Sequence, residues 1–406
     1  MALGLANKRV SSIAVDFGTD SLKLLQVLPS EPPQLVAAAT ITVPQEVRLN
    51  VDARHAFLTE ALRKLLRSHK FKGRKAICSI PSYQTLVQHL EIARLEHEDF
   101  DAQVGLHLRQ RLNVDPSRMI IRHFQVGQVV RDGTPKQVVI CLAASRESVM
   151  RYIETAHRAK LDVVGMHSEP LAILRAFGHL FRGEAGRQQT TCFIDLGAST
   201  TKVVISHGDQ MVFAKTIHAA GDHLTRHRAA RDRINFWEAR RIRIAEAAAG
   251  SSNRAAAPQT NPPPADAPDG GGLAVLDAPI AGGQQTITAT APTIAVTAAD
   301  TSDDGDDKDD TIDCIIDELQ MSVRHHQSLF PNRPIQKLVF LGGESHHVAM
   351  CQRIAQSLRI GAQLGDPLAR MVRLNQSGKS SGVDMRQPQP SWAVPMGLCL
   401  SEANLK

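Results

Sequence analysis

Two short segments carry the residue types that bind phosphate groups or a hydrated metal ion. They are Asp16-Phe-Gly-Thr-Asp-Ser-Leu-Lys23 and Asp195-Leu-Gly-Ala-Ser-Thr-Thr-Lys202. Small residues allow backbone N–H groups to approach an anion closely, and a carboxylate can hold a hydrated metal ion. One Asp-x-Gly turn is weakly informative, because Asp and Gly are common in turns. The repetition predicts two matching bends that grip the phosphates of one nucleotide from both sides.

Apolar, β-rich runs precede and follow both segments. Residues 13–15 and 192–194 lead into the bends, and residues 24–27 and 203–205 leave them. Two such runs joined by a Gly-containing turn predict a strand, a tight turn and a second strand. Each bend is therefore expected to join the strands of a hairpin, with its aspartate at the end of the first strand.

The rest of the chain alternates between strand and helix patterns. Residues 82–160 predict a small β-α-β-β-α unit, in which residues 132–135 form a hairpin turn. After the second hairpin, a helix is predicted from about Ala220. A strand over residues 336–341 ends in Gly342-Gly343 and is followed by another helix.

Composition and charge exclude several classes of protein. The chain has 406 residues, a net charge of +6 and 4% aromatic residues, and its basic residues are scattered, unlike the basic stripe of a nucleic-acid-binding protein. Its six cysteines have neither disulfide-framework nor zinc-site spacing. No apolar run is long enough for a membrane span and no signal peptide is evident, so we expect a cytoplasmic protein. Residues 247–310, rich in Ala, Pro and Asp, are predicted to be disordered.

The order of these elements resembles the fold shared by actin, sugar kinases and the ATPases of heat-shock proteins. Within that fold the chain is similar to the PilM family, the cytoplasmic actin-like proteins of type IV pilus assembly, which are related to the division protein FtsA. The two Asp-x-Gly segments resemble the family's phosphate loops, and residues 137–161 resemble the end of its inserted subdomain. Residues 338–343, 365–368 and 393–400 resemble its adenosine loop and closing helix.

The resemblance implies an α/β fold of the actin-like, ribonuclease H-like type. Two domains contain mixed β-sheets flanked by helices, and a small α+β subdomain is inserted. The implied boundaries are 1–81, 161–187 and 385–406 for domain I, 82–160 for the inserted subdomain, 188–246 and 311–384 for domain II, and 247–310 for the disordered insertion.

The resemblance also implies roles toward ATP and Mg²⁺. Asp16 and Asp195 are expected to hold the metal ion through water molecules, and Lys23 to neutralise phosphate charge. Gly342 and Gly343 allow the backbone to pass beneath the adenosine. The other implied nucleotide-binding residues are Gly18, Thr19, Gly197, Ala198, Ser199 and Gly221, with Glu238 and Arg241 at the ribose and base.

Some residues depart from this pattern or fall outside it. Lys202 is interpreted as an exposed strand lysine without a role. Glu344 follows the glycine pair, where its charge repels phosphate unless it faces the sugar or solvent. No residue is marked by the sequence as the group that positions water for hydrolysis.

The resemblance implies an assembly protein of a type IV pilus or type II secretion-like machine, placed at the cytoplasmic side of the inner membrane. It implies that a groove formed by parts of residues 12–80 and 82–160 binds a short peptide of a bitopic inner-membrane partner, PilN. ATP is expected to set the closure of the two domains, with slow hydrolysis at most. Self-association and contacts with other assembly proteins are further expectations. Two alternatives stay open: an FtsA-like division or filament protein, and a sugar-kinase relative that transfers phosphate.

Overall fold

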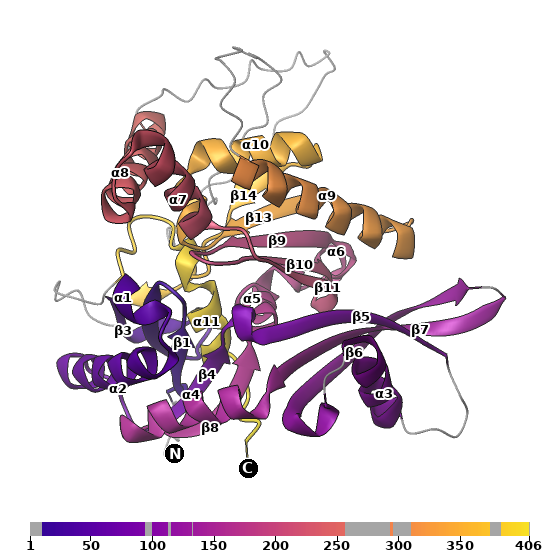
Figure 1. Ribbon diagram of the computed structural model, residues 1–406, viewed down its shortest axis with the longest axis horizontal. Helices are drawn as coiled ribbons and strands as arrows, with labels where there is room; N and C mark the ends of the chain where they lie inside the picture. The colour runs from indigo at the N-terminus through magenta and orange to yellow at the C-terminus, as the bar shows by residue number, and fades with distance from the viewer. Residues whose placement is uncertain are drawn as a thin grey trace, which may run out of the picture.

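The computed structural model describes residues 10–93, 100–112, 115–131, 133–255, 293–294, 310–373 and 383–405. These residues form an α/β fold with two large β-sheets and one smaller sheet (Figure 1). The strands are β1 (Ile13–Phe17), β2 (Ser21–Leu28), β3 (Gln34–Thr42), β4 (Lys75–Ile80), β5 (Thr85–Ala93), β6 (Met119–Arg131), β7 (Thr134–Ser145), β8 (Asp162–Ser168), β9 (Thr190–Leu196), β10 (Thr201–His207), β11 (Gln210–Ile217), β12 (Thr293–Ile294), β13 (Lys337–Leu341), β14 (Ala362–Leu364) and β15 (Val372–Arg373). The α-helices are α1 (Gln45–Arg48), α2 (Val51–Ser68), α3 (Phe100–Leu112), α4 (Arg146–Arg158), α5 (Glu169–Ala176), α6 (Glu184–Gln188), α7 (Gly221–Asp232), α8 (Phe236–Ala255), α9 (Asp310–Leu329), α10 (Val348–Leu358) and α11 (Ala393–Cys399).

Five strands of each large sheet follow one order: β3-β2-β1-β4-β8 in the first corresponds to β11-β10-β9-β13-β14 in the second. The first has the order β15-β3-β2-β1-β4-β8, and the second has the order β11-β10-β9-β13-β14-β12. In each sheet the central strand, β1 or β9, is antiparallel to the second strand of its hairpin and parallel to its other neighbour, β4 or β13. The two predicted hairpins are present, and their bends leave from equivalent positions in the two sheets.

The helices form layers between and outside the sheets (Figure 1). Ala14 of β1 and Phe193 of β9 belong to one core that also contains residues of α5 and α11, so these two helices pack between the sheets. The neighbouring residues Val15 and Ile194 point the opposite way, toward α2 and α4 on one side and α9 and α10 on the other. Alternation along each strand therefore buries both of its faces, as expected for central strands.

The small sheet, with the order β5-β7-β6, belongs to the segment predicted as an inserted subdomain. Its elements follow the predicted β-α-β-β-α order, and α3 covers one face of the sheet through apolar contacts. Ser145 caps α4, because its Oγ accepts a hydrogen bond from the N–H of Ser148 at 3.0 Å. The helix α4 then packs against α2 of the first domain.

Some elements differ from the sequence-based boundaries. The strand β15 comes from the segment assigned to domain II but pairs with β3 in the first sheet. Within the segment predicted to be disordered, α8 continues to Ala255, β12 pairs with β14, and α9 begins at Asp310. Residues 256–292 and 295–309 of this segment lie outside the described part of the chain. All six cysteines are free thiols, and only Cys314 is exposed. None of the described helices is both long enough and apolar enough to cross a membrane.

Candidate functional site

The two Asp-x-Gly bends line a single cavity of about 330 Å³ between the large sheets. Asp16 comes two residues after Ala14, and Asp195 two residues after Phe193, so strand alternation places both aspartates on the faces that look toward each other. The structure thereby brings together the two halves of the sequence repeat. Lys23 lines the same cavity, as do Gly342 and Gly343 from the loop after β13.

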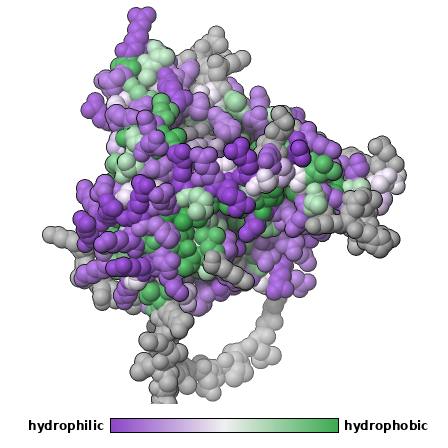
Figure 2. All heavy atoms as spheres, turned by 60° about the horizontal axis from the view of Figure 1, so that its bottom comes forward, coloured by the Kyte–Doolittle hydropathy of each residue, from purple (hydrophilic) through white to green (hydrophobic). Residues whose placement is uncertain are grey.

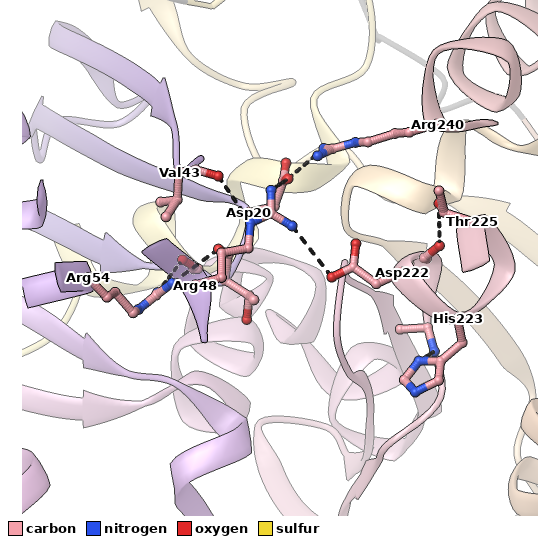
Figure 3. A network of polar contacts seen from close by, with 12 residues as sticks. Asp20, Val43, Arg48, Arg54, Asp222, His223, Thr225 and Arg240 are labelled. Atoms are coloured by element: carbon pink, nitrogen blue, oxygen red, sulfur yellow. Dashed lines mark hydrogen bonds and ion pairs between the residues drawn. The ribbon is translucent and has the colours of Figure 1, made fainter. Parts of the chain in front are cut away.

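A buried arginine of α2 holds the first bend from behind (Figure 3). Arg54 is only 3% exposed. Its guanidinium group donates to the carbonyl oxygens of Phe17 at 3.3 Å, Gly18 at 2.8 Å and Thr19 at 3.2 Å. In a planar trans peptide the N–H points away from the C=O, so these bonds turn the N–H groups of residues 18–20 toward the cavity. The bend is therefore set with its hydrogen-bond donors facing the open space.

The first turn of α7 holds the second bend in a similar way. The N–H of Gly221 donates to the carbonyl oxygen of Gly197 at 3.2 Å, and the N–H of Asp222 donates to that of Ala198 at 2.7 Å. The same peptide geometry turns the N–H groups of Ala198 and Ser199 toward the cavity. The Oγ of Ser199 is shielded from solvent and has no hydrogen-bond partner among the described residues. Both bends thus present donors that can bind an anion such as phosphate.

The interpretation of Lys202 as an exposed strand lysine is wrong. Lys202 is 8% exposed, and its side chain lines the cavity. Its Nζ lies 2.8 Å from Oδ2 of Asp195 and 3.2 Å from Oε2 of Glu169. Burial alone lowers the pKa of a lysine, but these two carboxylates outweigh that effect and hold the pKa of Lys202 above its usual range. Lys202 is therefore a charged group inside the site.

The repeat itself contained a signal for Lys202. In the first hairpin Lys23 stands opposite Asp16, and in the second Lys202 stands opposite Asp195. Directly opposed residues of an antiparallel pair project from the same face of the sheet. Each lysine therefore shares the face of an aspartate that was assigned to the site, so equal treatment of the two hairpins would have found Lys202.

Glu169 is a second cavity residue that the sequence did not mark. It is the first residue of α5, directly after β8, and it is buried. Its Oε2 accepts hydrogen bonds from the Oγ of Ser82 at 2.6 Å and from the N–H of Ser82 at 3.3 Å. Its ion pair with Lys202 joins the first domain to the second across the cavity. The only local signal was an acidic residue at the start of a proline-containing first helical turn, which many helices share.

Asp16 is buried beside these groups. Its Oδ1 accepts a hydrogen bond from the Oγ of Ser79 at 2.9 Å. Burial raises the pKa of Asp16 to about 6; Glu169 adds to the increase, whereas Lys23 and Lys202 oppose it. The carboxyl group of Asp16 is therefore harder to ionise than an exposed aspartate.

We expect Asp16→Asn to gain stability relative to the wild type as the pH rises. Because the pKa of Asp16 is about 6 in the folded protein against an ordinary value of 3.8, the folded state binds more protons between these two values, and the wild-type free energy of unfolding falls as pH rises through this window. The uncharged variant escapes this loss, which amounts to roughly 3 kcal/mol. Urea denaturation at about pH 4.5 and about pH 7.5 measures the difference. Asp52→Asn, at an exposed position of α2, is the control. If the difference in free energy of unfolding between Asp16→Asn and the wild type is the same at both pH values, the prediction is contradicted.

Ion pairs join the two domains at the mouth of the cavity (Figure 3). Arg48 of α1 pairs with Asp20 of the first bend, and its Nη1 also lies 3.5 Å from Oδ2 of Asp222 on α7. Arg240 of α8 reaches the same Asp20, with its Nη2 2.5 Å from Oδ1. These contacts tie the first bend to the helices of the second domain.

The glycine loop after β13 forms another part of the cavity wall. Gly342, Gly343 and Glu344 line the cavity there. The carboxylate of Glu344 pairs with Nη2 of the buried Arg243 at 2.6 Å. The charge of Glu344 is thus compensated, which removes the repulsion expected from the sequence.

Other predicted site residues are placed differently. The cavity-lining residues of α8 are Arg240 and Ile244, and neither Glu238 nor Arg241 is among them. Gly221 also lies behind the cavity wall, where its N–H supports the second bend. The members of the two bends predicted to bind phosphate, namely Gly18, Thr19, Gly197, Ala198 and Ser199, do line the cavity.

The two carboxylates expected to hold Mg²⁺ through water molecules, Asp16 and Asp195, already have partners in the protein. Mg²⁺ requires near-octahedral oxygen ligands at about 2.0–2.1 Å. The ammonium group of Lys202 already contacts Asp195, and Ser79 already donates to Asp16. Within the described part of the chain, no group of three or more His, Cys, Asp or Glu side chains is arranged to hold a metal ion.

Comparisons with known proteins agree with this architecture. A family model described as type IV pilus assembly protein PilM matches residues 14–253. The fold is similar to that in a PilM-PilN type IV pilus biogenesis complex, with a TM-score of 0.69 and 16% identity over 97% of this chain and 98% of the other. This similarity confirms the predicted fold class.

Weaker similarities extend to two further structures. The ethanolamine utilization protein EutJ from Carboxydothermus hydrogenoformans has a TM-score of 0.46 and 12% identity over 97% of this chain and 89% of its own. MreB5 of Spiroplasma citri bound to ADP has a TM-score of 0.42 and 10% identity over 96% of this chain and 94% of its own. A search of curated protein sequences gives no match.

Proposed function

The chain belongs to the PilM family of type IV pilus assembly proteins, and from this premise we propose that it binds ATP between its two domains and a peptide of an inner-membrane partner. ATP would set the closure of the domains and thereby the affinity for the partner. The observation that carries the nucleotide proposal is that both Asp-x-Gly bends line one cavity.

The hydrogen-bond donors of the two bends suit a polyphosphate. The two bends direct N–H groups into the cavity. Ser199 also lines it, and its Oγ has no hydrogen-bond partner in the described chain; rotation about χ1 would turn this hydroxyl group from its solvent-shielded position toward a phosphate oxygen. Lys23 lines the cavity beside Asp16 and forms no ion pair within 4 Å in the described ranges, so its ammonium group can contact a phosphate. These groups come from both domains, so both domains could contact one ligand bound between them.

The size of the cavity and its glycine-lined wall suit the rest of a nucleotide. A volume of about 330 Å³ lies within the range of roughly 300–1,000 Å³ that is usual for small-molecule sites. We place the adenosine beside Gly342 and Gly343, with Arg240 and Ile244 of α8 on its other side. Glu238 and Arg241 would then act indirectly, through the position of α8.

The ion pairs between the domains explain how a nucleotide could act on closure. Asp20 with Arg240 and Arg48 with Asp222 join the domains at the mouth, and Lys202 with Glu169 joins them inside the cavity. A ligand that binds both bends lies among these contacts. Its binding would favour the domain angle at which both bends reach it, which is the differential interaction that a conformational shift requires.

We propose that the partner is a PilN-like bitopic inner-membrane protein whose N-terminal peptide binds between the first domain and the inserted subdomain. Arg151 of α4 pairs with Asp52 of α2 at 3.1 Å, and Met150 and Val51, which precede these two residues in the sequence, are exposed. Figure 2 shows hydrophobic side chains gathered near the middle of one face, with hydrophilic ones around them. Such surface can bind an apolar peptide, and the partner would hold the protein at the inner membrane.

The buried carboxylate Glu169 is unsuited to act as the base of a sugar kinase, because it already has partners. A kinase needs a free carboxylate base beside the substrate hydroxyl group. Glu169 instead accepts hydrogen bonds from Ser82 and pairs with Lys202. It is therefore not available to take a proton from a sugar.

Calorimetric titration with ATP tests the nucleotide proposal. Ser199→Ala removes the unpartnered hydroxyl group and is expected to weaken ATP binding about tenfold, since a hydrogen bond to a charged group contributes about 1.5–3 kcal/mol. Ser206→Ala is the matched control, because Ser206 also has a buried Oγ without a partner but does not line the cavity. Absence of ATP binding in the wild type would reject the proposal. Equal affinities of the two variants would reject the placement of phosphate at the second bend.

A further inference from the structure

The ammonium group of Lys202 lies in the cleft between a carboxylate of the first domain and a carboxylate of the second. Its Nζ pairs with Asp195 of β9 in the second domain and with Glu169 of α5 in the first. The same Nζ lies 3.8 Å from the position that a Cβ on Gly197 would occupy, at the turn of the second bend. A fixed cation is therefore built into the bend that directs N–H groups toward the ligand.

The surroundings keep Lys202 at this place. The side chain is 8% exposed, and the residue is paired in register with Asp195 in the middle of a sheet. The ion pairs come from two different domains, so a rotation of the side chain would leave Asp195 and Glu169 buried without a counter-charge. The ammonium group is thus as fixed as the hairpin that carries it.

A divalent cation at the same carboxylates would compete with Lys202. Mg²⁺ held through water by Asp16 and Asp195 would lie within a few ångströms of the ammonium group, and like charges at that distance repel strongly in a buried site. The donor set therefore favours the lysine.

We propose that Lys202 takes the place of Mg²⁺ as the cation of this site, so that the protein binds ATP without a divalent metal ion. This inference rests on the proposed function, because it takes the ligand to be a nucleoside triphosphate. Lys202 would face the phosphates from the second bend, and Lys23 would face them from the equivalent position of the first.

Wild-type ATP affinity, measured by calorimetry with Mg²⁺ and with EDTA, tests the inference without any substitution. The two affinities are expected to agree within about threefold. A loss of more than about tenfold in EDTA would overturn the inference and leave the nucleotide proposal intact. If ATP does not bind under either condition, the proposed function fails. A second probe, Mn²⁺ in the presence of ATP, follows the metal ion itself by electron paramagnetic resonance: a spectrum of free Mn²⁺-ATP without a protein-bound component supports the inference, and a Mn²⁺ ion bound at the cleft overturns it.

Substitutions of the two lysines separate their roles. In Lys202→Met, the freed carboxylates should accept a metal ion, so ATP affinity is expected to depend on Mg²⁺ by about tenfold or more. Lys23→Met is the matched control, since it occupies the equivalent register position without an ion pair in the described chain; it should weaken binding equally with and without Mg²⁺. Lys202→Arg keeps a cation and should stay independent of metal. A folded Lys202→Met protein that remains independent of metal would overturn the inference, and if that variant fails to fold, the wild-type measurements stand by themselves.

Discussion

Gly342→Ala is expected to lower the free energy of unfolding by about 3 kcal/mol and to abolish ATP binding. Gly342 has a φ of +87°, a conformation that residues with a Cβ rarely adopt. An added Cβ would lie 2.2 Å from the carbonyl oxygen of Leu196 and 2.4 Å from Oδ1 of Asp195. The loop after β13 would have to move away from the second bend, which would displace a wall of the cavity. Urea denaturation and ATP titration measure the two effects.

Gly343→Ala is the matched control for the adjacent position. A Cβ on Gly343 would meet no atom within 4 Å, and its backbone is not in the left-handed region. We expect the stability of this variant to equal that of the wild type. Its ATP affinity should nevertheless fall, because Gly343 lines the cavity where the adenosine is placed. Equal stability of Gly342→Ala and the wild type would contradict the close packing of this loop, and unchanged ATP affinity in Gly343→Ala would contradict the placement of the adenosine.

Arg54→Met is expected to destabilise the protein by about 3 kcal/mol and to weaken ATP binding more than tenfold. Arg54 is the buried donor to the carbonyl oxygens of Phe17, Gly18 and Thr19. Its loss leaves these oxygens without that donor and frees the peptide planes to rotate. The N–H groups on the cavity side would then lose their common direction. Arg54 does not line the cavity, so any loss of ATP affinity would arise through the bend.

Arg67→Met is the control for this prediction, because Arg67 lies on the same helix but is exposed. It should leave both stability and ATP affinity unchanged. Amide hydrogen exchange in the unliganded protein adds a readout that a general loss of stability would not reproduce. In Arg54→Met, exchange should increase at Phe17, whose N–H donates to the Oγ of Ser79 at 3.0 Å, while the second bend keeps its wild-type rate. An ATP affinity equal to that of the wild type would contradict the positioning role of Arg54.

The hairpins and their bends could be predicted from the sequence because their signals are local. Apolar runs, a glycine turn and a repeated aspartate specify a strand, a bend and the face on which each aspartate lies. The strand that ends in Gly342-Gly343 has the same kind of local signature. Strand alternation then accounts for the meeting of Asp16 and Asp195, once two sheets pack face to face around α5 and α11.

The site residues that the sequence does not mark owe their positions to tertiary contacts. In the sequence Lys202 has the pattern of an exposed strand lysine, since lysines are rarely buried unless they are paired. Its partner Glu169 is far away in sequence and reaches it only because α5 packs between the sheets. Arg54 looks like one more basic residue on a helix, since no local pattern shows that it contacts three carbonyl oxygens of a distant loop.

The difference between the expected and the observed cavity residues of α8 has a simple geometric cause. Each residue of an α-helix is rotated by about 100° from the one before, so a small change in helix orientation replaces the residues on the inner face. The resemblance placed Glu238 and Arg241 toward the nucleotide, and the structure lines the cavity with Arg240 and Ile244 instead. A sequence pattern shows which residues of a helix share one face. The packing of α8 against α7 and α10 decides which of its faces meets the cavity.

Amide hydrogen exchange with and without ATP tests the central claim most directly, because the claim concerns N–H groups of both bends. If the bends hold the phosphates of one nucleotide, ATP should slow exchange at residues 18–20 and at Ala198 and Ser199 over the same range of ATP concentration. Adenosine, which lacks phosphates, should protect neither bend. Protection of only one bend, or of neither when calorimetry shows that ATP is bound, would contradict a shared phosphate site.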